Sequence, residues 1–252
     1  MSMDESAYAA PQSALDRPVE AGTRSLEDAI EGNWDFDIME VMSEAWQKIS
    51  GAKGAMWVGI LVMYAATFVL QMVAGGIAAA LGEGSVLGIA IALTVQLGGQ
   101  AIAYVVTAGV YYFALKWAAG DQSATATDVL VGFSVAAPLL GVYLLMSLLA
   151  LVGFLFFILP GVYLIIAYSL AAPLVIDRGL GVWEALETSR KAISNHWFKV
   201  FGLGLLASIA AGLGMVLTLG IGVVWAMPFF FMVYGVLYNR IFGYSGAGEA
   251  AG

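Results

Sequence analysis

The chain has 252 residues, of which 61% are hydrophobic and only 11% are charged. Soluble domains are about 45–50% apolar and about 25% charged, so a soluble protein of this composition could not cover itself with polar side chains. The net charge of −8 comes largely from the N-terminal segment and gives no electrostatic case for nucleic acid as a partner. Because the chain has no Cys, disulfides, thiolate metal sites and a Cys nucleophile are excluded.

The two ends of the chain, residues 1–34 and 243–252, lack apolar periodicity. Residues 1–34 are rich in Ala, Ser, Asp and Glu, a composition that buries too little apolar surface to fold. We therefore predict a disordered acidic N-terminal tail and a flexible C-terminal tail. No signal peptide is expected, because the N-terminus is acidic and no short apolar run follows it.

A short amphipathic helix is predicted before the first long hydrophobic segment. Its apolar side chains recur at helical spacing, at Ile38, Val41, Met42, Ala45 and Ile49. The same spacing recurs before the fifth hydrophobic segment, at Val182, Ala185, Leu186, Ser189 and Ile193. A weaker version occupies residues 128–133. We predict that these helices lie in the membrane interface; docking of the same stripes onto protein is the alternative.

Six hydrophobic segments are long enough to cross a bilayer, which needs about 20 apolar residues per helix. Two long charge-free runs, 129–176 and 200–239, are each expected to fold back once, at Pro160-Gly161 and near Gly220. The predicted spans are 55–80, 87–115, 135–157, 161–176, 199–219 and 222–241, within a transmembrane domain of residues 35–242.

The predicted fold is therefore an all-α integral membrane protein with six transmembrane helices in three hairpins, each led by an amphipathic segment. Because each unit has an even number of spans, the three units would share one orientation, with an axis near the membrane normal. The alternative to this threefold repeat is that any cytoplasmic segment leading into a span tends to be amphipathic.

Basic side chains of the hydrophobic part lie at alternate junctions between the predicted spans. These residues are Lys48, Lys53, Lys116, Arg178, Arg190, Lys191, Lys199 and Arg240, whereas the junctions at 82–86, 157–161 and 218–222 have none. The positive-inside rule then predicts two cytoplasmic termini, in a multi-pass protein of the bacterial inner membrane. Lipid headgroup contacts are expected for Lys48, Lys53, Arg178, Arg190, Lys191 and Lys199.

The most distinctive motifs lie between residues 159 and 197. They are Leu159-Pro160-Gly161-Val162-Tyr163, the run 168–177, Gly181-Val182-Trp183-Glu184-Ala185-Leu186, Ser189 and His196-Trp197. With these motifs, residues 35–242 resemble the YciC-like bacterial inner-membrane proteins and are similar to the membrane domain attached to some glycerophosphodiester phosphodiesterases. The resemblance implies a six-helix membrane protein of no established activity and brings no catalytic residues. The phosphodiesterase chemistry belongs to a separate soluble domain outside this sequence.

Polar side chains within the predicted spans are few, and the main ones are Gln71, Gln96 and Gln100. Gln96 and Gln100 share one helix face, where they are expected either to bond to another helix or to line a polar cavity. No span has an ionisable residue away from its ends, which argues against a proton-coupled or charge-moving transporter.

Small residues follow one face of the fifth span, at Gly204, Ser208 and Gly212, and permit close helix approach. Packing within the chain is the default use of this face, and a homo-oligomer or another membrane protein is the alternative partner. His196 is the only histidine, and we expect it to have a structural role.

We predict no enzyme, metal or cofactor, because no catalytic constellation is recognisable. The leading hypothesis is a non-enzymatic membrane scaffold that organises lipid or partner proteins. The alternative is a small-molecule channel or transporter, whose route would be lined by Gln96, Gln100 and helices kinked at Pro138, Pro173 and Pro228. The lipid bilayer is the partner that the composition requires.

Overall fold

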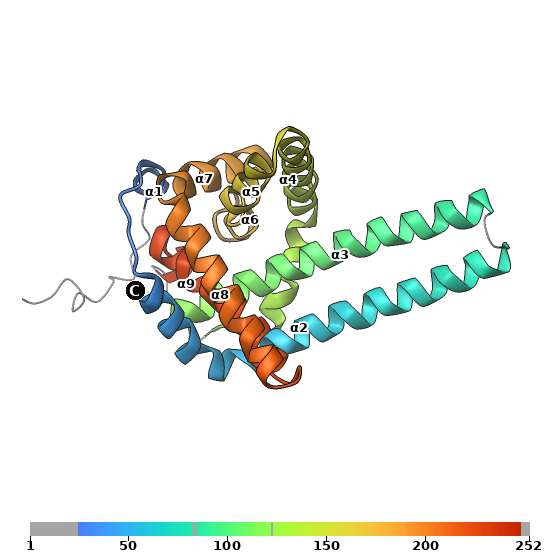
Figure 1. Ribbon diagram of the computed structural model, residues 1–252, viewed down its shortest axis with the longest axis horizontal. Coiled ribbons are helices and arrows are strands. Elements are labelled where there is room, and N and C mark those ends of the chain that lie inside the picture. Colours follow the sequence, from blue (N-terminus) through green and yellow to red (C-terminus); the bar gives the residue numbers. More distant parts are fainter. Residues whose placement is uncertain (1–24, 83–84, 122, 248–252) are drawn as a thin grey trace, which may run out of the picture.

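The computed structural model of the protein describes residues 25–82, 85–121 and 123–247 (Figure 1). All regular elements within these ranges are helices, which confirms the all-α class. In chain order they are α1 (Leu26–Glu31), α2 (Ile38–Ala80), α3 (Val86–Ala118), the 3-10 helix η3 (Ala126–Val135), α4 (Ala136–Phe156), α5 (Ile158–Ala167), α6 (Ala171–Arg178), α7 (Val182–Asn195), α8 (Trp197–Leu217), α9 (Val223–Ile241) and the 3-10 helix η4 (Ser245–Ala247).

Five segments of the described chain are long and apolar enough to cross a membrane. They are α2, α3, η3 together with α4, α5 together with α6, and α8. These segments give the chain the length and composition of a multi-pass membrane protein. The sixth predicted span corresponds to α9, which is outside this group and carries the polar residues Asn239 and Arg240 in its last turn.

The molecule consists of a body of packed helices and a long hairpin that extends away from it (Figure 1). We call this hairpin the arm. It comprises residues 61–82, from α2 and the turn after it, and residues 85–104, from the start of α3 with its N-cap. Large apolar side chains of the arm are exposed, for example Phe68 at 65% and Leu97 at 70%. An apolar surface of this extent requires lipid or protein to cover it.

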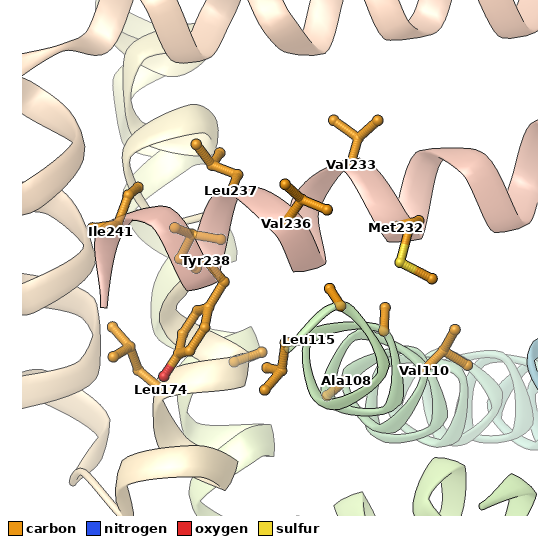
Figure 2. Packing of buried hydrophobic residues seen from close by; sticks show 14 of the residues in the cluster. Ala108, Val110, Leu115, Leu174, Met232, Val233, Val236, Leu237, Tyr238 and Ile241 are labelled. Atoms are coloured by element: carbon orange, nitrogen blue, oxygen red, sulfur yellow. The ribbon is translucent and has the colours of Figure 1, made fainter. Parts of the chain in front are cut away.

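Helix α9 lies at the centre of the body and packs against α2, α3 and α8. Figure 2 shows Met232 above Val110 of α3 and Tyr238 turned toward Leu174 of α6, and all four side chains are buried. Gly235 permits this packing, because a Cβ there would lie 2.7 Å from the backbone carbon of Ala114. Full burial of a large apolar side chain contributes about 1.5–3 kcal/mol, so the core forms around α9.

The first predicted interfacial stripe is packed into the protein instead. In α2, Val41 and Ala45 are fully buried and Ile49 is 2% exposed, on a helix that packs along α9 and α3. The prediction that this stripe is buried in the membrane interface is wrong, and the alternative of docking onto protein is realised within the chain. Periodicity shows that a helix has an apolar face, but it does not show what covers that face.

The second stripe, on α7, is buried in the same way. Ala185 and Ile193 are fully buried and Leu186 is 1% exposed, against α4, α5 and α6. The polar face of α7 remains exposed. The interfacial prediction is therefore wrong for this stripe as well.

Helix α2 joins the first amphipathic segment and the first predicted span without a break, over 43 residues. It begins with Asp37 as N-cap, whose carboxylate accepts the N–H of Glu40 at 2.9 Å. In Figure 1, α2 changes direction between its blue start and its cyan remainder. The amphipathic segment therefore points away from the direction of the arm.

The middle amphipathic segment forms η3, a 3-10 helix, where the other two leading segments are α-helical. Val129 of η3 is fully buried and lies between α2 and α3 at two glycines. A Cβ at Gly59 would lie 2.1 Å from Val129 Cγ1, and one at Gly109 would lie 1.9 Å from the Val129 carbonyl oxygen. The threefold repeat stays a prediction, because the three leading segments differ in helix type.

The fourth predicted span is interrupted, because α5 ends at Ala167 and α6 begins at Ala171. Ser189 of α7, fully buried, bridges the interruption. Its hydroxyl donates to the carbonyl of Ala167 at 2.7 Å and accepts the N–H of Leu170 at 3.2 Å. Backbone groups freed in an apolar interior need such partners.

We expect the substitution Ser189→Ala to lower the free energy of unfolding by about 1–3 kcal/mol, since it leaves buried backbone groups without partners. Denaturant unfolding in detergent, followed by circular dichroism, measures this effect. Ser208→Ala is the matched control, because the Ser208 hydroxyl bonds to the Gly204 carbonyl at an exposed site; its effect should stay within about 0.5 kcal/mol. Equal effects of the two substitutions would contradict the bridging role.

Two of the three prolines predicted to kink helices stand just after a break in their span, between η3 and α4 and between α5 and α6. Pro138 and Pro173 are each the third residue of a helix, α4 and α6, where a missing N–H removes no helical hydrogen bond. These prolines therefore stand in first turns. Pro228 does lie inside α9, and a kink there stays a prediction.

The predicted N-terminal tail is too long. Residues 25–34 include α1, which packs on α7, and Trp34, which is 4% exposed and donates its indole N–H to the Ala29 carbonyl at 3.1 Å. Disorder is wrong for this stretch, because Trp34 and Phe36 anchor it in the core. The predictions for residues 1–24 and 248–252 lie outside the described residues.

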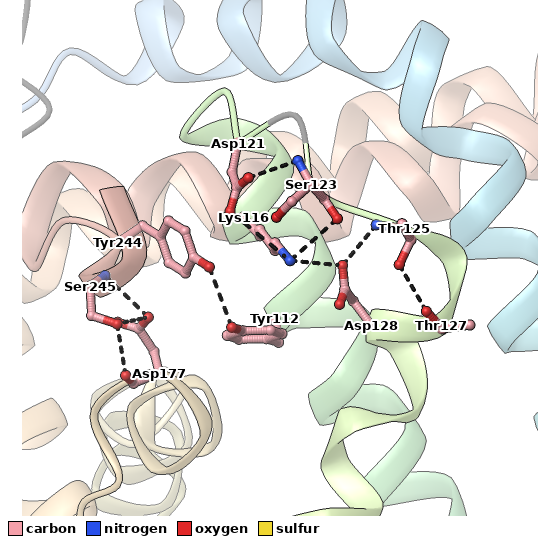
Figure 3. Close-up of polar contacts among 10 residues, drawn as sticks. All are labelled: Tyr112, Lys116, Asp121, Ser123, Thr125, Thr127, Asp128, Asp177, Tyr244 and Ser245. Carbon is pink, nitrogen blue, oxygen red and sulfur yellow. Dashed lines mark hydrogen bonds and ion pairs between the residues drawn. The ribbon is translucent and has the colours of Figure 1, made fainter. Parts of the chain in front are cut away.

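Polar clusters hold the C-terminal end of α3 and the segment after α9 in place (Figure 3). Lys116 contacts Asp128 at 3.2 Å and Asp121 at 4.0 Å, which ties the end of α3 to η3. Asp177 of α6, whose side chain is fully buried, accepts the Ser245 hydroxyl at 2.9 Å. Residues 243–247, predicted to be part of a flexible tail, are thus attached to the body.

Two contacts conflict with the predicted membrane topology. The hydroxyls of Tyr163, in the second turn of α5, and Ser194 lie 2.6 Å apart, although the topology places the start of α5 and the end of α7 on opposite faces. Lys53 Nζ lies 5.4 Å from the ring centroid of Trp225, beside the junction predicted on the other face. Opposite faces of a bilayer core are about 30 Å apart. The prediction that Tyr163 and Ser194, or Lys53 and Trp225, lie on opposite faces is therefore wrong.

Candidate functional site

Two of the six cations predicted to contact lipid headgroups bind carbonyl groups at helix ends. Lys48 pairs with Glu44 at 2.7 Å and donates to the carbonyl of Ala118, at the end of α3. Arg178 donates to the carbonyl of Phe242 at 2.6 Å, just after α9. Cations are favourable at helix C-termini, where carbonyl groups lack helical partners. Both side chains therefore have a structural role.

The remaining four predicted headgroup residues lie nearer the surface. Lys53 lies over the Trp225 ring, in a cation–π contact. On α7, Arg190 and Lys191 both pair with Glu187, at 2.7 and 3.5 Å, and the Arg190 hydrogen bond holds the pKa of Glu187 below its ordinary value. Lys191 and Lys199 are the most accessible of these cations, with side chains 48% and 45% exposed.

An open groove of about 610 Å³ lies where α5 meets the junction of α7 and α8. We call it the α5–α8 groove. It is lined by Leu159, Tyr163, Ser194, Asn195, His196, Trp197, Phe198 and Lys199. One side of the lining is apolar and the other carries hydroxyl, amide, imidazole and ammonium groups, so the groove is amphipathic.

The polar lining is held in place by bonds to the chain itself. The Trp197 indole donates to the Tyr163 carbonyl at 3.3 Å, and the Asn195 amide donates to the Ile30 carbonyl at 2.9 Å. The His196 ring lies edge-on to Trp34 and 3.3 Å from the Gly32 carbonyl oxygen. The segment before α2 therefore lies against the polar lining residues.

The groove cation Lys199 pairs with that segment. Its ammonium group lies 2.5 Å from a carboxylate oxygen of Asp35. The hydrogen bond from Lys199 holds the pKa of Asp35 below its ordinary value of 3.8. Because the Asp35 side chain is 64% exposed, solvent screens this pair.

We expect the Asp35–Lys199 pair to persist from neutral pH down to pH 3.8. A depressed carboxyl pKa adds stability above the unfolded-state pKa, and this stability is lost as pH falls through the folded-state value. The difference in melting temperature between the protein and its Asp35→Asn variant should therefore stay constant above pH 3.8 and disappear below it. A difference that vanishes already near neutral pH would contradict the assignment.

The apolar side of the groove continues into the turn between α4 and α5, which we call the α4–α5 tip. Its five side chains are all more than two-thirds exposed: Leu155, Phe156, Phe157, Ile158 and Leu159. Five consecutive large apolar side chains at a tip would be unstable in water. The groove therefore lies beside a surface suited to hydrocarbon.

The predicted polar residues of the spans lie elsewhere, on the arm. Gln71 Nε2 donates to Gln96 Oε1 at 2.9 Å, which joins α2 to α3. The side chains of Gln71, Gln96 and Gln100 are exposed, and Gln96 and Gln100 lie one helix turn apart on α3. The α5–α8 groove has a different lining, as do two smaller cavities of about 250 and 240 Å³ beside α8 and α9. The structure thus does not bring these amides to any of the three cavities.

Within the described residues, no group of three or more His, Asp and Glu side chains could hold a metal ion. The chain matches no family model, no curated protein and no solved structure. The resemblance to YciC-like proteins therefore stays a prediction.

Sequence reasoning missed Asp35 and Tyr163 as members of the site. The spacing of Trp34 and Phe36 around Asp35, in an otherwise polar segment, was a signal that this segment is anchored. Tyr163 gave no comparable signal, because its contact with Ser194 depends on how α5 packs against α7.

Proposed function

We propose that the protein is a non-enzymatic, multi-pass protein of the bacterial inner membrane that organises lipid around its apolar surfaces. One observation carries the proposal: the amphipathic α5–α8 groove opens beside the exposed α4–α5 tip. A surface that combines hydrocarbon-like and cationic parts matches the two parts of a phospholipid. The exposed arm and α8 extend the apolar surface available to lipid.

Both termini of the described chain lie at the same end of the body, and we propose that this end is cytoplasmic. Asp35 pairs with Lys199 at the start of α8, and Glu40 pairs with Arg240 at the end of α9, at 2.8 Å. Lys48 and Lys116 also lie near this end, because they contact the end of α3 and the segment that follows it. A cluster of basic side chains supports a cytoplasmic location. We further propose that α9, which packs beside α8, is the sixth span.

Native mass spectrometry of the purified full-length protein tests lipid organisation. The proposal predicts that phospholipid stays bound after detergent is removed in the gas phase, and that proteoliposomes show no small-solute flux above protein-free vesicles. A lipid-free chain would contradict the proposal. Flux that is lost in the Gln96→Leu variant would replace it with transport.

A further inference from the structure

We infer that the α5–α8 groove binds an anionic phospholipid, with Lys199 receiving the phosphate and Asp35 acting as an internal competitor for the same ammonium group. This inference rests on the proposed lipid-organising function and names the lipid class and its contacts.

The size and the walls of the groove fit one part of a lipid molecule. A volume of about 610 Å³ lies within the range of roughly 300–1,000 Å³ found for small-molecule sites. Leu159 and Phe198, on its apolar side, are 79% and 83% exposed. An acyl chain that lies along them would continue onto the α4–α5 tip.

The polar side of the groove offers the positive charge of Lys199 for a phosphate group. Lys199 and the ring of His196 come from the start of α8. The hydroxyls of Tyr163 and Ser194 lie beside them, and the Ser194 hydroxyl donates to the Arg190 carbonyl. Among the residues that line the groove, Lys199 carries a full positive charge, and its carboxylate partner is Asp35. Neutralising Asp35 would leave this ammonium group without that partner. The charge of Lys199 therefore favours an anion at this position.

The pairing of Asp35 with Lys199 supports the same ligand. A carboxylate 2.5 Å from the ammonium group shows that an anionic oxygen fits at this position. Both side chains are largely exposed, at 64% and 45%, and an exposed ion pair contributes only about 0–1 kcal/mol. A phosphate, which has more acceptor oxygens and forms charge-assisted hydrogen bonds, can therefore displace the carboxylate at little cost.

Titration of the full-length protein in detergent with phosphatidylglycerol, followed by native mass spectrometry, tests the inference. Lys199→Gln is expected to weaken binding about 10-fold, the effect of one charge-assisted hydrogen bond. Asp35→Asn is expected to strengthen binding about 2- to 5-fold, since it removes a weak exposed competitor. Lys53→Gln is the matched comparison, a lysine outside the groove, and should weaken binding less than Lys199→Gln does.

The two opposite effects keep the test free from a folding artefact, because a damaged protein would not bind more tightly. Equal losses for Lys199→Gln and Lys53→Gln, or weaker binding by Asp35→Asn, would overturn the inference. Equal binding of phosphatidylcholine with the same acyl chains, or full displacement of phosphatidylglycerol by millimolar inorganic phosphate, would also overturn it. Loss of all phospholipid binding by the unmodified protein would refute the proposed function itself, whereas binding that ignores Lys199 would refute only this site.

Discussion

Replacement of Asp177 by Ala is expected to lower the free energy of unfolding by about 3–5 kcal/mol, the effect of removing one partner from a buried ion pair. The Asp177 side chain is fully buried and contacts Arg178 Nε at 3.1 Å. It also accepts the Tyr238 hydroxyl at 2.7 Å and the Ser245 hydroxyl at 2.9 Å. Without the carboxylate, Arg178 Nε, the Tyr238 hydroxyl and the Ser245 N–H lose an acceptor. The segment after α9 then loses part of its attachment to α6.

Thermal and denaturant unfolding in detergent measure the loss, and proteolysis of the segment after Phe242 reports its release. Asp35→Ala is the matched control, since Asp35 also pairs with a cation but is exposed; its effect should not exceed about 1 kcal/mol. If Asp177→Ala were as mild as Asp35→Ala, the cluster at the end of α6 would not hold the chain end.

The second large effect is expected for Gly109→Ala on α3. A Cβ there would lie 1.9 Å from the carbonyl oxygen of Val129 and 2.7 Å from its carbon. These are backbone atoms, which cannot rotate away, so η3 must move from α3. Overpacking of this kind lowers stability by about 1–3 kcal/mol.

Gly98→Ala, on the same helix, provides the comparison. A Cβ at Gly98 meets nothing within 4 Å, and alanine is favoured over glycine in a helix by about 0.8–1 kcal/mol. Gly98→Ala should therefore leave stability unchanged or raise it. A loss of stability with Gly98→Ala equal to that with Gly109→Ala would show that α3 and η3 do not approach as closely as the structure has them.

Most of the helices could be predicted from the sequence, because local features specify them. Asp37 caps α2, and the uncharged runs before Leu81 and after Ser85 fill the two helices of the arm. The turn near Gly220 also separates α8 from α9 as expected. These features depend on residues that are close together in the chain, so they can be recognised in a single sequence.

Features that depend on distant contacts could not be predicted. The stripe of α7 was recognised, but its burial against α4, α5 and α6 was not. The interruption between α5 and α6 is satisfied by Ser189, which is about twenty residues away. No local feature of Tyr168 or Ser169 indicates that a distant hydroxyl group will bind the backbone there.

The placement of the start of α5 on the face opposite the end of α7 was wrong for a related reason. The positive-inside rule assumes that each apolar run crosses the bilayer in turn. In α5, with ten residues, the helix is about 15 Å long, too short to cross alone, and its start remains beside the end of α7. The basic residues therefore identified the residues that gather at one end of the body, but they did not predict the position of the α4–α5 tip.

Cysteine cross-linking between α5 and α7 tests the groove most directly, in a chain that has no native Cys. In membranes, Tyr163→Cys combined with Ser194→Cys should be joined by a short bifunctional thiol reagent, because the two native hydroxyls are 2.6 Å apart. Ser85→Cys combined with Ser194→Cys should not be joined. Ser85 is the N-cap of α3 and Ser194 lies in α7, and the start of α3 is at the arm tip whereas α7 is in the body (Figure 1). If the first pair also failed to react in the folded protein, α5 and α7 would be separated, as the roughly 30 Å between opposite membrane faces requires, and the groove would not exist.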